Sequence, residues 1–219
     1  MGLKPNIDVD KIVFLAKEGI EKFSRNSELY ISPMFFATEG FIIPTSTSAE
    51  FVLSIFESPL PEEKGFSACL TQFRRPALNM APTMAKASCL YPNVARGLRE
   101  ANSKGFDVGV VLDPNGNVAE FSYTNLFMVR DGMVSTPAIN GTFLNGITRQ
   151  RIIKLLRDDG ILVTERSINF EELLTASELF GTGNFAKISP CTQIEAKKLK
   201  IGPLYLKARE LYFDYVGAC

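Results

Sequence analysis

The chain has 219 residues, of which 46% are hydrophobic and 11% aromatic, and its 24 basic residues balance 24 acidic ones. This size and composition predict one globule, or one globule with a minor second lobe. Because the chain has neither a net charge nor a basic cluster, nucleic acids and anionic membranes are excluded as partners, which leaves a small molecule or another protein.

Histidine is absent from the sequence. Because imidazole is the usual base of a nucleophilic triad and a frequent zinc ligand, triad hydrolases and histidine-ligated zinc sites are excluded. The cysteines are scattered without a C-x-x-C pair, which predicts neither a metal site nor a disulfide framework: Cys69, Cys89, Cys191 and Cys219. We expect reduced thiols in a cytoplasmic protein. No apolar run is long enough for a transmembrane helix or a signal peptide, so we expect neither secretion nor membrane insertion.

The first part of the chain is predicted to hold one helix and two strands. Apolar residues recur at helical spacing over residues 9–23, with Asp8 available as a cap, and β-branched and aromatic residues fill residues 29–37 and 49–56. Two prolines, a charge cluster and a closing glycine follow at residues 58–65, as is typical of a linker. We therefore expect a small domain over residues 1–58, a linker over residues 59–65 and a large domain over residues 66–219.

The rest of the chain mixes strands and helices. Asp113-Pro-Asn-Gly116 and Asp131-Gly132 are turn sequences, because proline presets the backbone and glycine tolerates positive φ, so each is expected to close a hairpin. Strands are expected at residues 67–74, 107–112, 117–121, 126–130, 133–136 and 161–164 and on both sides of 181–184, and helices at residues 92–103, 148–158, 170–176 and 203–215. Since strands and helices do not alternate regularly, we expect an α+β fold with a mostly antiparallel sheet.

Lys86 and Glu120 are the two charged residues that ordinary packing explains least. Lys86 stands among small and apolar neighbours, and a lysine taken out of water becomes a neutral amine that attacks carbonyl groups. A surface lysine before a helix is the alternative. Glu120 ends the strand after the Asn-Gly turn, where it faces solvent or, ionised, pairs with a positive nitrogen of a cofactor.

Two glycine-containing segments are candidate anion sites. In Leu144-Asn-Gly-Ile-Thr-Arg149 a glycine turn runs into a helix, whose free N–H groups and Thr148 suit a phosphate, although plain helix punctuation explains the same residues. Gly181-Thr-Gly-Asn184 is either a flexible turn or a second set of amides. An imine-forming lysine, a carboxylate and two phosphate-sized cradles are together the protein groups that pyridoxal 5′-phosphate requires.

Five segments, in this order, resemble the fold-type IV pyridoxal-phosphate enzymes. They are Ala85-Lys86 with Tyr91, residues 112–120, Asn125-Leu-Phe127, Gly146-Ile-Thr-Arg149 and Glu178 to Asn184. That family includes branched-chain aminotransferases, D-amino-acid aminotransferases and aminodeoxychorismate lyases. The resemblance covers the chain from Val9 to the C-terminus. It implies the D-amino-acid aminotransferase-like fold, here a truncated small α/β lobe followed by a larger, mostly antiparallel sheet or barrel domain with helices.

The resemblance implies a role for each matching residue. Lys86 would hold the cofactor through an imine and move a proton between the substrate and the cofactor, and Glu120 would keep the pyridinium nitrogen protonated. Tyr91 would hydrogen-bond the phenolic oxygen, and Arg75 is interpreted as structural. The remaining assignments are phosphate binding by Gly146, Ile147, Thr148, Gly183 and Asn184, and substrate binding by Tyr30, Asn184 and Phe185.

Two departures from the family bear on activity. The longer first lobe of family members carries an arginine that clamps the phosphate, and nothing in this chain corresponds to it. We expect weaker cofactor binding, and either impaired activity or a partner subunit that supplies the missing groups. Ser32 stands where branched-chain aminotransferases often have an arginine for the distal carboxylate of 2-oxoglutarate, so glutamate is a less secure donor.

The preferred interpretation is an aminotransferase of the branched-chain type, which moves an amino group between an apolar amino acid and a 2-oxo acid. Within the family, the alternative is an aminodeoxychorismate lyase or a D-amino-acid aminotransferase. The alternative from another class is a catalytically silent binding or assembly module that retains the fold. By resemblance alone we expect a homodimer.

Overall fold

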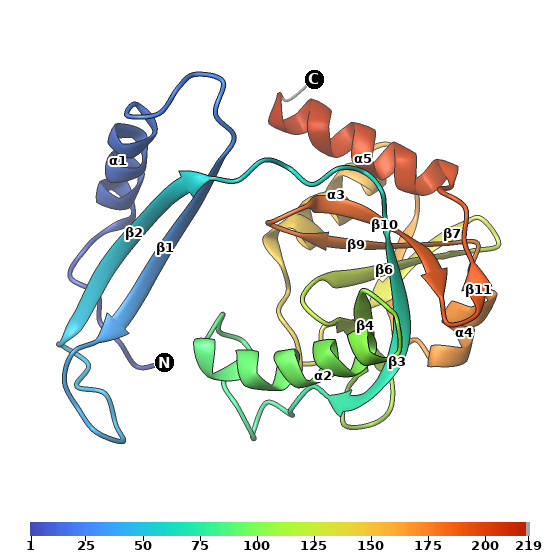
Figure 1. Ribbon diagram of the computed structural model, residues 1–219, viewed down its shortest axis with the longest axis horizontal. Coiled ribbons are helices and arrows are strands. Elements are labelled where there is room, and N and C mark those ends of the chain that lie inside the picture. The colour runs from blue at the N-terminus through green and yellow to red at the C-terminus, as the bar shows by residue number, and fades with distance from the viewer. Residues whose placement is uncertain (218–219) are drawn as a thin grey trace. The chain divides into compact units, whose positions relative to one another are not determined.

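A computed structural model describes residues 1–217, and the chain divides between Pro61 and Glu62 into two units, Met1–Pro61 and Glu62–Cys219 (Figure 1). The boundary falls within the segment of prolines and charges at residues 59–65. Cys219, one of the four cysteines expected to be reduced, lies outside the described residues.

The first unit consists of one helix and one β-hairpin. Helix α1 covers Val9–Ile20, and the Asp8 carboxylate caps it by accepting a hydrogen bond of 2.7 Å from the backbone N–H of Lys11. Strands β1 (Leu29–Ala37) and β2 (Ala49–Glu57) pair antiparallel along their full length. The predicted helix and both predicted strands of this region are confirmed, with the helix ending earlier than expected.

The second unit is built on a curled nine-stranded sheet in the order β5-β4-β3-β10-β9-β6-β7-β8, with β11 paired to β10 (Figure 1). Its strands are β3 Phe66–Arg74, β4 Val108–Leu112, β5 Val118–Phe121, β6 Asn125–Arg130, β7 Met133–Pro137, β8 Val163–Arg166, β9 Glu178–Gly183, β10 Lys187–Ile194 and β11 Lys197–Lys198. Five of its strand pairs are antiparallel, and three are parallel: β3 with β4, β3 with β10, and β7 with β8. The predicted α+β fold with a mostly antiparallel sheet is therefore confirmed.

Helices cover both faces of this sheet. Helix α2 (Tyr91–Ser103), which follows a 3-10 turn at Ser88–Leu90, packs on β3 and β4, whereas α3 (Ile147–Asp158) and α5 (Pro203–Val216) pack on each other and on β9 (Figure 1). Helix α4 covers Phe170–Thr175. Alternate residues of β6 enter two separate cores: Leu126 packs with β4 and β5, and Phe127 packs with α3 and α5. The central strands are consequently apolar on both faces.

Two local expectations were wrong, and one short strand was not expected. The strand expected at residues 161–164 is β8, Val163–Arg166, because the chain first makes a turn with Gly160 at positive φ. The glycines at 181 and 183, interpreted as a turn between strands, belong to β9 itself, where their missing side chains let Thr124 approach closely. Strand β11 was not expected, since only two residues form it. Among the described residues, no helix is both long and apolar enough to cross a bilayer.

Glu178 attaches helix α5 to the sheet. This carboxylate is buried on β9 and accepts hydrogen bonds from the first turn of α5, at 3.2 Å from the N–H of Leu204 and 2.7 Å from that of Tyr205. Glu178→Ala should lower the free energy of unfolding by about 2 kcal/mol, because buried donors lose their acceptor. Urea unfolding measures this, and the exposed Glu62→Ala should change it by less than about 0.5 kcal/mol. Equal effects of the two substitutions would contradict this role.

Candidate active site

One cavity of about 640 Å³ in the second unit collects most of the residues that the sequence singled out. The predicted site residues that line it are Lys86, Tyr91, Glu120, Gly146, Ile147, Thr148, Gly183 and Asn184. They come from the loop before α2, from α2 itself, from β5, from the first turn of α3 and from the end of β9. Such a volume suits a cofactor of moderate size together with a small substrate.

Two predicted substrate-binding residues are placed differently. Phe185 is exposed in the turn after β9 and is not among the described residues that line the cavity. Tyr30 belongs to the first unit, where its ring stacks on Phe56 with the ring centres 5.5 Å apart. Substrate binding by these two residues stays a prediction.

Glu120 is buried, which excludes the alternative that it faces solvent. Its carboxylate pairs with the guanidinium of Arg75 and lies 3.4 Å from the amide nitrogen of Asn125. Burial raises the pKa of this carboxyl to about 7, while the charges of Arg75 and Lys86 act in the opposite direction. The site therefore holds an acid whose proton is exchangeable near neutral pH and whose ionised form is favoured by any further positive charge.

Arg75, interpreted from the sequence as structural, pairs with a predicted site residue. Besides Glu120 it reaches the carbonyl oxygen of Ser122, at 3.3 Å, and it lines the cavity. Its Nε is buried without a hydrogen-bond partner among the described residues. The sequence carried no signal for this pairing, because the loop after β3 and strand β5 meet only in the folded sheet.

Lys86 lies in the loop between β3 and α2 and lines the same cavity as Glu120. The loop is held in place by the buried Thr83, whose hydroxyl donates to the carbonyl oxygen of Gly141. The expectation that Lys86 is taken out of water is wrong, since its side chain is exposed within the cavity wall. Its charge nonetheless acts on the Glu120 carboxyl, so the predicted amine and acid share one site.

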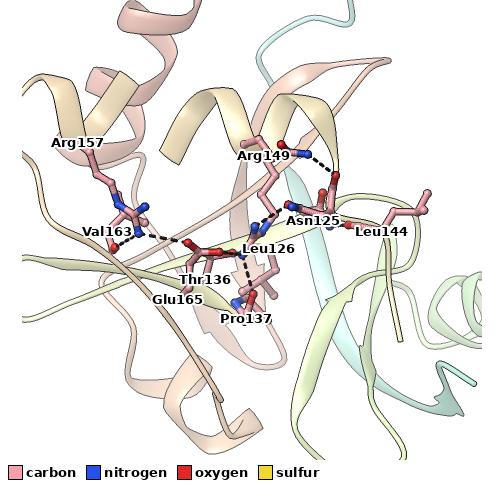
Figure 2. Close-up of polar contacts among 11 residues, drawn as sticks. Asn125, Leu126, Thr136, Pro137, Leu144, Arg149, Arg157, Val163 and Glu165 are labelled. Carbon is pink, nitrogen blue, oxygen red and sulfur yellow. Dashed lines mark hydrogen bonds and ion pairs between the residues drawn. The ribbon is translucent and has the colours of Figure 1, made fainter. Parts of the chain in front are cut away.

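Side chains of Arg149 and Asn125 hold the turn before α3 through hydrogen bonds (Figure 2). The guanidinium of Arg149, fully buried, donates to the side-chain oxygen of Asn145 at 2.9 Å, the carbonyl of Pro137 at 2.8 Å and the carboxylate of Glu165 at 2.9 Å. Asn125 donates to the carbonyl oxygen of Leu144 at 2.9 Å. These contacts fix the turn whose amides begin the helix.

Gly146, the residue before α3, must be a glycine because of its surroundings. A Cβ there would lie 2.3 Å from the side-chain oxygen of Asn125, although the backbone dihedrals of Gly146 are open to any residue. Asn125 also approaches Glu120, so one side chain connects the acid with the first turn of α3. Asn125 therefore links the Glu120 carboxylate to the N-terminus of α3. A helix N-terminus attracts anions.

Thr182 is a site residue that the sequence analysis missed. It lies on β9 opposite Asn125, is almost fully buried, and lines the cavity, yet its hydroxyl oxygen has no hydrogen-bond partner in the described part of the chain. A buried hydroxyl without a partner is costly, so this position suits a polar ligand. Its signal was hidden by the two flanking glycines, which were interpreted as a flexible turn.

Pyridoxal phosphate, the cofactor expected from the sequence, fits these residues. The buried carboxylate of Glu120 suits its protonated ring nitrogen, and the first turn of α3 with the hydroxyls of Thr148 and Thr182 suits its phosphate. The amine of Lys86 lies on the wall of the cavity, where it can reach an aldehyde.

Comparisons with known proteins bear on this geometry. The family model described as amino-transferase class IV matches residues 1–194. An aminotransferase from Brucella abortus, solved as a crystal structure bound to the co-factor PLP, is 47% identical, with a TM-score of 0.97 over 99% of this chain and 79% of that chain. A branched-chain aminotransferase from Thermoproteus uzoniensis, solved with norvaline, is 29% identical, with a TM-score of 0.91 over 99% of this chain and 74% of that chain.

Two curated proteins are similar in sequence. A probable branched-chain-amino-acid aminotransferase from Aquifex aeolicus is 32% identical over 96% of this chain and 70% of its own length. A branched-chain-amino-acid aminotransferase from Pseudomonas aeruginosa is 33% identical over 86% of this chain and 64% of its own length. The chain thus spans about two thirds of the length of these relatives.

Proposed function

The chain belongs to the class IV aminotransferases, and from this premise we propose that it is a pyridoxal-phosphate-dependent enzyme that moves an amino group between an apolar amino acid and a 2-oxo acid. Branched-chain amino acids are the proposed substrates, because the curated relatives carry that name. The observation that carries the proposal is the placement of Lys86, the Glu120–Arg75 pair and the first turn of α3 around one cavity.

Pyridoxal phosphate supplies an aldehyde that takes up the amino group and a ring that absorbs the electron pair left when the bond between Cα and its hydrogen breaks. The amine of Lys86 would hold the aldehyde carbon of this group, and its Nζ would carry the proton that leaves Cα. Because Lys86 is exposed in the cavity wall rather than enclosed, it can reach both atoms by rotating its flexible chain.

Glu120 supplies the negative charge that holds a proton on the ring nitrogen. Burial raises the pKa of this carboxyl, and the charge of Arg75 opposes the increase, so the ion pair favours the ionised carboxylate. A protonated ring nitrogen adds a further positive charge beside it. The amides of Ile147 and Thr148 and the hydroxyls of Thr148 and Thr182 would bind the phosphate.

Apolar and aromatic residues also line the cavity. Met84, Leu90, Val94 and Tyr123 supply this surface, which supports an apolar amino acid over an acidic one. Ser32, in place of the arginine often found in branched-chain aminotransferases, makes glutamate a weaker donor in this proposal. Transamination of leucine coupled to 2-oxoglutarate, compared with pyruvate release from aminodeoxychorismate, separates the aminotransferase from the lyase.

Covalent labelling tests the proposal at its centre. The protein is reconstituted with pyridoxal phosphate, reduced with borohydride and digested, and the peptide masses are measured. We expect a pyridoxyl group on Lys86, whereas a silent binding or assembly module would leave that residue unmodified. The exposed Lys154, on the outer face of α3, serves as the control and should remain unlabelled.

We further propose a homodimer in the cytoplasm. The hairpin of the first unit presents Phe41, Ile42 and Ile43 at exposures of 80% or more, which is apolar surface suited to burial against a second copy. Cys69, Cys89 and Cys191 are free thiols in the structure, as is typical of a reducing compartment. Light scattering on the purified protein measures the mass of the particle, and a monomer would contradict the dimer.

A further inference from the structure

Helices α3 and α5 form one wall of the cavity, and this wall carries a guanidinium and two phenols. Thr148 and Arg151 lie three residues apart on α3 and so share a face, and Tyr212 and Tyr215 lie likewise on α5. All four side chains line the cavity. Of these four residues, only Thr148 was expected from the sequence to contact a ligand.

Arg151 stacks on an aromatic ring in a way that leaves its donors available. The centre of its guanidinium lies 4.2 Å from the centre of the Tyr215 ring. A stacked guanidinium uses its flat face, while its N–H groups point outward in the plane and can bind a phosphate in bidentate fashion. The stack therefore orients Arg151 without occupying its hydrogen-bond donors.

The neighbouring groups are neutral donors. Burial raises the pKa of Tyr212, whose hydroxyl is hydrogen-bonded to Thr148, so the phenol stays protonated at neutral pH. On strand β9, the hydroxyl of Thr182 is buried at the cavity wall and has no hydrogen-bond partner among the described residues. That orphaned hydroxyl is an independent sign that a polar ligand belongs at this end of the cavity.

Arg151 differs from the other cationic side chains of the cavity, because it has no interaction with Glu120. Three cationic side chains line the cavity among the described residues: Arg75, Lys86 and Arg151. Arg75 is paired with Glu120, and Lys86 acts on the same carboxyl. A phosphate monoester carries a charge between −1 and −2 at neutral pH, which amides and hydroxyls bind but do not neutralise.

We propose that Arg151 binds the phosphate group of the cofactor, as a charged partner to the first turn of α3 and to the hydroxyls of Thr148 and Thr182. The inference rests on the proposed function, since it needs a phosphorylated cofactor in this cavity.

Binding titrations of the cofactor-free protein test this role without measuring turnover. Dissociation constants are determined by absorbance for pyridoxal phosphate and for pyridoxal, which lacks the phosphate. Arg151→Gln should weaken binding of pyridoxal phosphate by about tenfold or more and leave binding of pyridoxal unchanged. Arg151→Lys, which keeps the charge but not the fork of donors, should lie between the wild type and Arg151→Gln. Inorganic phosphate should compete with pyridoxal phosphate in the wild type and much less in Arg151→Gln.

Lys154→Gln is the matched control, because it removes the same charge from the outer face of the same helix and should leave both dissociation constants unchanged. Arg151→Met, which preserves packing on Tyr215, is a second charge-free variant in case Arg151→Gln unfolds, and thermal unfolding without cofactor reports on folding. Equal weakening for pyridoxal and pyridoxal phosphate would overturn the inference, as would an effect confined to the KM of the 2-oxo acid.

The same titrations separate this inference from the proposed function. A wild-type protein that binds neither compound would contradict the proposed function itself. A wild-type protein that binds pyridoxal phosphate, with unchanged binding in both charge-free variants of Arg151, would contradict only the role of Arg151.

Discussion

Lys86→Ala is expected to abolish nearly all turnover of the reconstituted enzyme. This substitution removes both the amine that holds the cofactor aldehyde and the base that moves the proton from Cα, and loss of such a group slows the reaction by about 10³-fold or more. The measurement is a single-turnover reaction with leucine, followed by the absorbance of the cofactor. Because the phosphate contacts remain, the variant should still bind pyridoxal phosphate, now without covalent attachment.

Two controls make the assignment of Lys86 specific. Lys154→Ala removes an exposed lysine outside the cavity and should leave the rate unchanged. A small primary amine added to Lys86→Ala should restore part of the rate, because it supplies the missing base in solution. A Lys86→Ala variant that keeps the wild-type rate would show that another residue performs this chemistry.

Glu120→Gln should leave the cofactor bound but lower kcat by about 10²-fold or more, since an amide cannot hold a proton on the ring nitrogen. Burial makes the position sensitive, because solvent has little access to the Glu120 side chain. Rates of proton loss from Cα-deuterated and protonated leucine locate the slow step. Glu62→Gln, at an exposed position in the linker, should have no effect. A wild-type kcat in Glu120→Gln would contradict the pairing of Glu120 with the ring.

The same residue predicts how stability depends on pH. Folding raises the pKa of Glu120 from 4.5 to about 7, so the folded protein holds this proton more tightly than the unfolded chain does. The free energy of unfolding of the cofactor-free protein therefore loses a contribution on the order of 3 kcal/mol as the pH rises from 4.5 to about 7. Glu120→Gln should lack this component, whereas Glu62→Gln should retain it. Urea unfolding between pH 4.5 and 8 measures the difference.

Local chemistry was enough to locate most elements and motifs. The Asn-Gly turn before Asn117 and the Asp-Gly turn before Met133 join antiparallel strands, as the turn sequences predicted. Helical spacing of apolar residues located α1, α2, α3 and α5. The segments around Lys86, Glu120 and Gly146, recognised in the sequence, line one cavity in the second unit.

Tertiary structure alone decided the environment of each group. Glu120 could face either side of its strand in the sequence pattern, but in the structure it is buried and pairs with Arg75, which lies in the loop after β3. Lys86 was expected to be out of water but is exposed. Thr182 was assigned to a turn, yet pairing with Asn125 keeps it in a strand and leaves its hydroxyl without a partner. The stacking of Arg151 on Tyr215 could not be predicted, because the two residues lie on different helices, α3 and α5.

The physical reason is the range of the interactions. Helix periodicity, capping and turn conformation depend on residues within about four positions of each other, so the amino-acid sequence by itself determined the elements and the order of the motifs. Burial, ion pairing and pKa depend on residues that are tens of positions apart and meet only when β3, β5, β9, α3 and α5 are assembled. The chemistry of this cavity was therefore decided by the packing of those elements.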